Sequence, residues 1–158
     1  MKIGIPKEIL PGERRVSLVP DAVKKLVDQG VEVIVESGAG SASLFTDDMY
    51  AAAGATKVED PETLYRSTEL YLKVQAPIID STTGQNEVNM MSEGSTVIGL
   101  LQPMTNVELV KKLLQKNITA LSMDTIPRIA RAQSMDALSS QSSIAGYKSI
   151  LIAADRLG

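Results

Sequence analysis

The chain alternates short apolar runs with stretches of helical spacing, and this alternation limits its fold more than any other feature. The runs that we interpret as strands are residues 2–5, 31–35, 70–74, 96–101 and 118–123. Helical spacing or capping residues occur between them, at 20–30, 46–54 and 107–115. Apolar strands separated by helices are typical of a parallel sheet with helices on its faces. We therefore expect one compact α/β unit.

The ends of these runs indicate where a ligand would bind. In open parallel sheets, ligands bind beyond the carboxyl ends of the strands. The segments at those ends are 6–8, 36–40, 73–77, 102–103 and 124–128. We expect functional side chains in these segments.

Composition disfavours several classes of protein. Of the 158 residues, 44% are hydrophobic and 22% charged, which is typical of a globular chain, and the net charge of -3 disfavours nucleic-acid binding. No apolar run reaches the roughly 18 residues of a membrane span. The start MKIGIPKE is unlike a signal peptide. Without Cys there is no disulfide framework, so we expect a cytosolic location.

The chain contains neither His nor Cys, which limits its chemistry. Nucleophilic triads and zinc sites that need imidazole or thiolate are excluded within it. Carboxylates gather at 46–48 and at Glu59-Asp60, both at expected helix starts. Carboxylates in such places cap helices more often than they bind metals. We therefore expect no metal.

A glycine-rich loop follows the second strand. Gly38 and Gly40 match the first two glycines of a dinucleotide-binding fingerprint, but the third position is Ser43. Residues 44–47 then begin a new helix cap. Pyrophosphate binding needs such a loop to open directly onto a helix amino end, so we interpret this segment as a crossover loop.

The segment RAQSMDALSSQS, residues 131–142, has helical spacing but many polar residues. Ser and Asp are unfavourable inside helices because they compete for backbone hydrogen bonds. At about 100° per residue, one stripe of the helix carries Asp136, Ser140, Ser143 and Tyr147, with Ser139 beside them. Small residues elsewhere predict a helix that is buried along much of its length. Its polar groups then need partners, which could be a neighbouring loop, an ordered water or a ligand.

Three segments resemble one family. Residues 127–151, PRIARAQSMDALSSQSSIAGYKSIL, are similar to NAD(H)-binding domain I of the alpha subunit of proton-translocating NAD(P) transhydrogenases. Residues 1–40 and the segment KVQAP, residues 73–77, resemble both that family and its relative alanine dehydrogenase. The resemblance covers the chain end to end, and it is most specific in residues 127–151.

The resemblance implies a fold and a domain division. Residues 1–127 would form a Rossmann-like, or flavodoxin-like, parallel sheet flanked by helices. Residues 128–158 would form a nicotinamide-contacting loop and a long interdomain helix. The second NAD-binding subdomain, with the pyrophosphate fingerprint, would be absent from this chain, and so would a C-terminal segment that packs on the first subdomain. The isolated chain is therefore expected to be inactive.

The resemblance also implies roles for single residues. Arg128, Gln133 and Asp136 would be catalytic. Arg128 would contact the carboxamide oxygen of nicotinamide, and Asp136 and Ser139 would hold the carboxamide or ribose. Gln133 would reach towards NADP(H) on the partner subunit. Tyr147 would contribute to cofactor binding.

Arg15 and Lys73 match positions where alanine dehydrogenases bind their substrate, so they would belong to a substrate-like pocket. Those enzymes also have a catalytic His after the strand that here ends at Leu101, where this chain reads Gln102-Pro103. Amino-acid oxidation needs a proton shuttle, and His is suited to it near neutral pH. Hydride transfer between two nicotinamides needs positioning instead. The missing His favours transfer between NADH and NADP+.

The implied assembly contains NAD(H) here and NADP(H) on a beta subunit, together with a membrane domain. This chain would be peripheral on the cytoplasmic side of the inner or plasma membrane, held by its partners, and part of a homodimer. Two alternatives stay open: an alanine-dehydrogenase-like oxidoreductase fragment, and a non-catalytic binding or assembly module.

Overall fold

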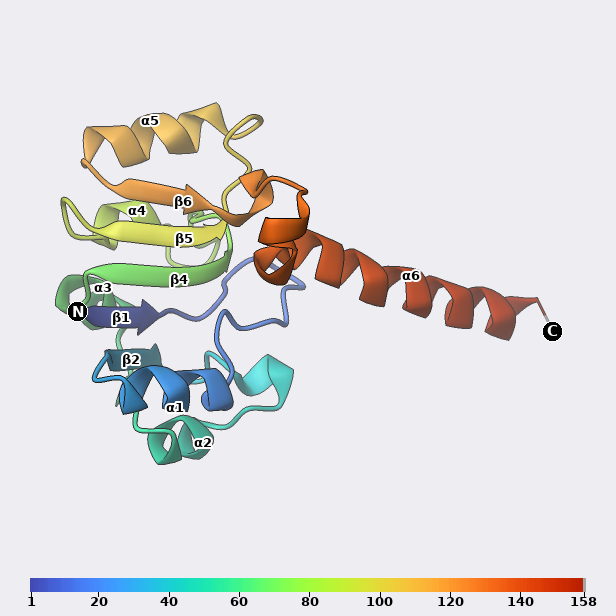
Figure 1. The fold of residues 1–158 in the computed structure, drawn as a ribbon. Helices are drawn as coiled ribbons and strands as arrows, with labels where there is room; N and C mark the ends of the chain where they lie inside the picture. The colour runs from blue at the N-terminus through green and yellow to red at the C-terminus, as the bar shows by residue number, and fades with distance from the viewer. Residues whose placement is uncertain (158) are drawn as a thin grey trace.

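A computed structural model describes residues 1–157 and contains a six-stranded sheet (Figure 1). Its strands are β1 (Lys2–Ile5), β2 (Glu32–Glu36), β3 (Thr56–Val58), β4 (Leu70–Gln75), β5 (Thr96–Leu100) and β6 (Thr119–Ser122). The spatial order is β3-β2-β1-β4-β5-β6, and all neighbouring strands are parallel. This is the Rossmann order, with a switch point between β1 and β4. The expected parallel α/β fold is confirmed.

Helices pack on both faces of this sheet. They are α1 (Pro20–Asp28), α2 (Asp47–Ala52), α3 (Pro61–Ser67), α4 (Glu87–Met90) and α5 (Val107–Gln115). On one face, Val33 and Val35 share a core cluster with Val23 of α1 and Tyr50 of α2. A second cluster joins the other face to α3, α4 and α5. Right-handed crossovers require this division, because the chain reverses direction at the switch point.

The face that carries α1 and α2 is open over β4, β5 and β6. Leu72, Ile98 and Leu100 are only half-buried there, and Leu121 is 52% exposed. Figure 1 shows α1 in front of β2 at the opposite end of the sheet. The opening therefore begins beside the switch point.

Local chemistry accounts for most element boundaries. Thr46 caps α2 by accepting a hydrogen bond from Met49 N, and Asp60 caps α3 through two backbone N–H groups. Both carboxylate-rich spots therefore lie at helix starts, as predicted. The sequence did not predict β3, because this strand has three residues and two of them are exposed.

Two 3-10 helices, η2 (Met123–Thr125) and η3 (Ala130–Met135), lead into α6 (Ala137–Arg156). Figure 1 shows α6 projecting away from the sheet. The expectation of a largely buried helix is wrong for this chain: α6 has no buried residue, and Ile144 and Tyr147 are 64% and 69% exposed. Its apolar pattern reported the composition of a face that residues 1–157 do not cover. No helix within residues 1–157 has the length and apolarity needed to cross a membrane.

Candidate functional site

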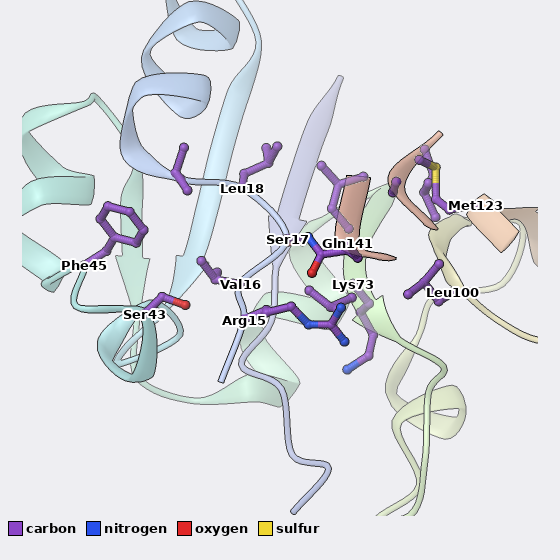
Figure 2. Close-up of a pocket in the computed structure, with 15 residues that line it drawn as sticks. Arg15, Val16, Ser17, Leu18, Ser43, Phe45, Lys73, Leu100, Met123 and Gln141 are labelled. Carbon is purple, nitrogen blue, oxygen red and sulfur yellow. The ribbon is translucent and has the colours of Figure 1, made fainter. Parts of the chain in front are cut away.

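A cavity of about 490 Å³ lies beyond the carboxyl ends of β4 and β5, beside the switch point (Figure 2). Its apolar walls include Val16, Leu18, Phe45, Leu72, Val74, Ile98, Leu100 and Met123. Polar side chains from three separate segments also line it: Arg15, Ser17, Ser43 and Gln141. An apolar hollow with a few polar groups at a switch point is typical of a small-molecule site. This cavity is the candidate site.

The loop between β1 and α1 forms one wall and is held by distant side chains. The Tyr50 hydroxyl donates to Leu18 O at 2.7 Å, and the Ser43 hydroxyl donates to Arg14 O at 2.5 Å. Burial raises the pKa of Tyr50 to about 12, so its hydroxyl stays a donor at neutral pH. The Ser17 Oγ atom is buried without a hydrogen-bond partner among the described residues.

Arg15 reaches the cavity but is tied to Glu13. Its Nε donates to Glu13 Oε1 at 2.8 Å, and its Nη2 donates to Glu13 Oε2 at 2.5 Å. Gln75 Nε2 also donates to Glu13 Oε2, at 2.7 Å. Hydrogen bonds from Arg15, followed by that from Gln75, lower the pKa of Glu13 to about 2. Glu13 is therefore ionised at neutral pH and balances the charge of Arg15.

Lys73 lines the cavity with its stem, while its amino group lies on the other side of β4. Figure 2 shows the Lys73 side chain extending away from Leu100 and Met123. Lys73 Nζ lies 2.6 Å from Glu87 Oε1 and 3.5 Å from Glu8 Oε2, and its side chain is 1% exposed. Residues alternate between faces along a strand, so Leu72 and Val74 face the cavity and Lys73 does not. The structure thus separates Lys73 from Arg15, with which the sequence grouped it.

Three further groups complete this buried cluster around Lys73. The Tyr65 hydroxyl donates to Glu87 Oε1 at 2.7 Å, and Ile78 N donates to Glu87 Oε2 at 2.8 Å. Glu8 accepts from Val74 N at 2.6 Å. Burial raises the pKa of Glu8, although Lys73 and Val74 N partly offset this.

A strand irregularity exposes the amides that Glu8 binds. The register between β4 and β5 shifts between Leu72 and Gln75. Gly99 lies opposite, where an added Cβ would be 2.9 Å from the Lys73 carbonyl oxygen. Glycine lets the two backbones approach, and the shifted register leaves Val74 N and Gln75 N for Glu8.

The glycine-rich loop binds a carboxylate of its own chain. Asp47 accepts from Gly38 N at 2.8 Å and from the Ser37 hydroxyl at 2.8 Å. The loop continues into η1 (Ser41–Ser43), a 3-10 helix of three residues. Its interpretation as a crossover loop is consistent with this geometry, since Asp47 takes the position that a phosphate oxygen would need.

At the start of α6, the predicted residues bond to one another. Asp136 is the N-cap: its Oδ1 accepts from Ser139 N at 3.0 Å and its Oδ2 from the Ser139 hydroxyl at 2.5 Å. The hydroxyls of Ser140 and Ser143 donate to carbonyls four residues earlier. Local backbone therefore satisfies much of the polar stripe. The stripe is nevertheless not sealed from the cavity, because Ala137 and Gln141 of α6 line it.

The remaining predicted residues lie at different distances from this N-cap. Arg128 is exposed and close enough for its charge to lower the pKa of Asp136, after the larger effect of the Ser139 hydrogen bonds. Gln133 is exposed on η3. Tyr147 lies three turns along α6, about 16 Å from Asp136 at 1.5 Å per residue, and does not line the cavity.

Sequence reasoning missed several residues of the site. Glu8, Glu13, Gln75, Glu87 and Gln141 were not singled out, since each stands alone among unrelated neighbours. Glu8 and Gln75 did lie in segments expected at the carboxyl ends of strands, which was the available signal. No group of three or more metal-binding side chains occurs within residues 1–157.

Comparison with known proteins assigns the fold to a family. The family described as alanine dehydrogenase/PNT, N-terminal domain, matches residues 4–145. The chain belongs to this family. Within it, the chain is 46% identical over 151 residues to the first of the polypeptides that make up the NAD(P) transhydrogenase alpha subunit of Rhodospirillum rubrum, covering 96% of this chain and 39% of that protein. It is 34% identical over 157 residues to an alanine dehydrogenase of Methanococcus maripaludis, covering 99% of this chain and 40% of that protein.

Solved structures of the family agree with this order. A transhydrogenase from Sinorhizobium meliloti superposes with a TM-score of 0.89 at 36% identity, covering 98% of this chain and 44% of that one. An L-alanine dehydrogenase gives a TM-score of 0.73 at 32% identity, covering 80% of this chain and 33% of that one. The chain spans less than half the length of these relatives. Alanine dehydrogenase is the more distant relative in both comparisons.

Proposed function

We propose that this chain is the N-terminal part of the NAD(H)-binding component of a proton-translocating NAD(P)+ transhydrogenase, where hydride passes between NADH and NADP+. The observation that carries the proposal is its greater similarity to the transhydrogenase alpha subunit, at 46%, than to alanine dehydrogenase, at 34%. The chemistry of the cavity supports the same function. Its lining includes no histidine, the side chain best suited to shuttle protons near neutral pH during amino-acid oxidation.

The residues at the start of α6 fit the nicotinamide end of NAD(H). A carboxamide offers one acceptor oxygen and two N–H donors. Arg128 is exposed and makes no side-chain hydrogen bond within residues 1–157, so its guanidinium is free to donate to that oxygen. The Ser139 hydroxyl donates to Asp136 and keeps lone pairs that accept from an amide N–H.

Each residue then has a positioning role. Arg128 and Ser139 would hold the carboxamide, and Asp136 would fix Ser139 and the first turn of α6. Gln133 is exposed on η3, where it would face NADP(H) held by another subunit. The apolar walls of the cavity would exclude water from the ring. Bound NAD(H) supplies the hydride.

The proposal includes the rest of the assembly. NADP(H) would bind to a beta subunit, and proton movement would take place in a membrane domain. The chain would form part of a homodimer and lie on the cytoplasmic side of the membrane, attached through its partners. These parts follow from the relatives named as subunits of NAD(P) transhydrogenase.

Arg128→Ala in the full assembly tests the assigned role. We expect hydride transfer to fall at least about tenfold, since one charged hydrogen bond to the substrate is lost, with the free energy of unfolding changed by less than about 0.5 kcal/mol. Stopped-flow transfer rates and urea unfolding measure the two effects. Arg131→Ala, at a second exposed arginine of the same segment, is the control. Equal rates for both variants would refute the role of Arg128, and alanine-dependent NADH formation would favour the alternative enzyme.

Tyr147→Phe should leave stability within about 0.5 kcal/mol, because its side chain is exposed on α6. In the full assembly, a cofactor-binding hydroxyl predicts a raised Kd for NADH. Fluorescence titration measures it, and an unchanged Kd would remove Tyr147 from the site.

A further inference from the structure

Charged side chains gather at the carboxyl ends of β1 and β4, and carboxylates outnumber cations among them. Glu8, Glu13 and Glu87 carry three negative charges when ionised, whereas Arg15 and Lys73 carry two positive charges. Every cation in the group contacts a carboxylate at 2.6 Å or less. The group as a whole therefore offers no spare positive charge to a ligand.

Only one of these cations belongs to a side chain that reaches the cavity with its charged end. Arg15 lines the cavity, while the amino group of Lys73 is buried against Glu87 behind β4. Both guanidinium bonds of Arg15 end on Glu13, which Gln75 holds from the other side. A carboxylate ligand would have to displace Glu13 from Arg15 and then lie beside the displaced charge. Repulsion of this kind is an effective means of rejecting one ligand class.

A neutral polar ligand does not meet this obstacle. The Ser17 hydroxyl is without a partner among the described residues, and Gln141 offers both an amide donor and an acceptor. The walls are otherwise apolar. Such a lining suits an uncharged carboxamide or carbonyl compound.

We propose that Glu13, held by Gln75, is the specificity-determining residue of this cavity: by neutralising Arg15 it makes the cavity accept a neutral amide and reject a carboxylate. The inference deepens the proposed function, since it explains why a member of this family would not act on an amino or 2-oxo acid. It rests on that function only for the identity of the neutral group. The cavity and the pairing of Arg15 stand without it.

The test compares pyruvate with pyruvamide, two probes of nearly equal shape that differ in charge. Binding of each to the chain is measured by NMR titration, from the shifts of Val16 and Ser17 amides, without any coenzyme. Glu13→Gln keeps the shape and hydrogen-bonding capacity of the side chain but removes its charge. We expect this variant to bind pyruvate at least about tenfold more tightly than the parent, with the affinity for pyruvamide changed less than about twofold.

Two further variants separate specificity from structure. Gln75→Lys keeps Glu13 and adds a cation beside it, so it should also raise pyruvate affinity and serves if Glu13→Gln does not fold. Glu108→Gln removes an exposed carboxylate of α5 with the same change in net charge and should have no effect. A structural role alone would change both probes equally. Pyruvate affinity that is the same in the parent and in both cavity variants would overturn the proposal, and would leave the transhydrogenase assignment to the Arg128 test.

Discussion

Two clusters in this chain use the same chemical groups in opposite surroundings. Behind β4, Lys73, Glu87 and Tyr65 combine a cation, a carboxylate and a hydroxyl, all buried. At the start of α6, Arg128, Asp136 and Ser139 combine the same three groups, but Arg128 and Ser139 are exposed.

The difference shows what burial demands. In the Lys73 cluster each group bonds to residues far away in the sequence, because an unpaired buried charge is costly. In the Asp136 cluster the bonds are local, and Arg128 makes no side-chain hydrogen bond within residues 1–157. The first cluster is suited to holding the sheet and helices together, and the second retains groups for a ligand.

The strongest test of this contrast is Lys73→Met, which keeps the stem of the side chain and removes its charge. Glu87 and Glu8 would then face each other in the interior without a cation. We expect the free energy of unfolding to fall by about 3–5 kcal/mol, as measured by urea denaturation. Lys111→Met, at an exposed pair with Glu108, should cost less than about 1 kcal/mol. Equal losses would mean that burial does not distinguish the two lysines.

Alkaline pH should act on the buried cluster next. Burial, then the charge of Glu87, raises the pKa of Tyr65 well above its usual 10. Above pH 10 the unfolded chain loses this proton while the folded chain keeps it, so stability should fall as pH rises. Thermal unfolding between pH 8 and pH 11 measures the slope (about 10 being the usual pKa).

Tyr65→Phe is the control for that slope. Tyr50, whose pKa is also raised by burial, remains in both proteins, so the difference between them isolates Tyr65. A slope that is identical in the variant would show that Tyr65 ionises in the folded chain.

The smallest effect is expected at the second cluster, from Asp136→Ala. Removing the N-cap costs about 1 kcal/mol, and because α6 is exposed the loss should appear as fraying of its first turn rather than as global unfolding. Cα chemical shifts of residues 137–143 measure it. Asp136→Asn should retain most of the cap. Ser139 lowers the pKa of Asp136, so the parent's cap should persist above the usual 3.8 and weaken as pH falls below it.

The parts of the structure that the sequence predicted are those set by nearby residues. Apolar strands, helix caps at Thr46 and Asp60, and the fold class all follow from local patterns. The proximity of Asp136 and Ser139 is of the same kind, since three residues separate them on one helix. In contrast, β3 is too short and exposed to leave an apolar pattern.

Long-range pairings were beyond sequence reasoning. Glu8, Lys73 and Glu87 meet although tens of residues separate them, and nothing in their immediate neighbours marks them as partners. The same applies to Glu13 and Gln75. The exposure of α6 was missed for another reason: its apolar face was visible in the sequence, but what covers such a face is decided by the rest of the fold. The assigned roles of Arg128, Gln133 and Tyr147 stay predictions.

The projecting helix also has a mechanical consequence. With 20 residues α6 is about 30 Å long, and it packs chiefly against η2 near its first turn. A tilt of about 10° around Asp136 would therefore carry the far end through about 5 Å, a simple lever amplification of that length. Small rearrangements at one capped turn, where Ala137 and Gln141 touch the cavity, are in this way geared to large excursions at a distance.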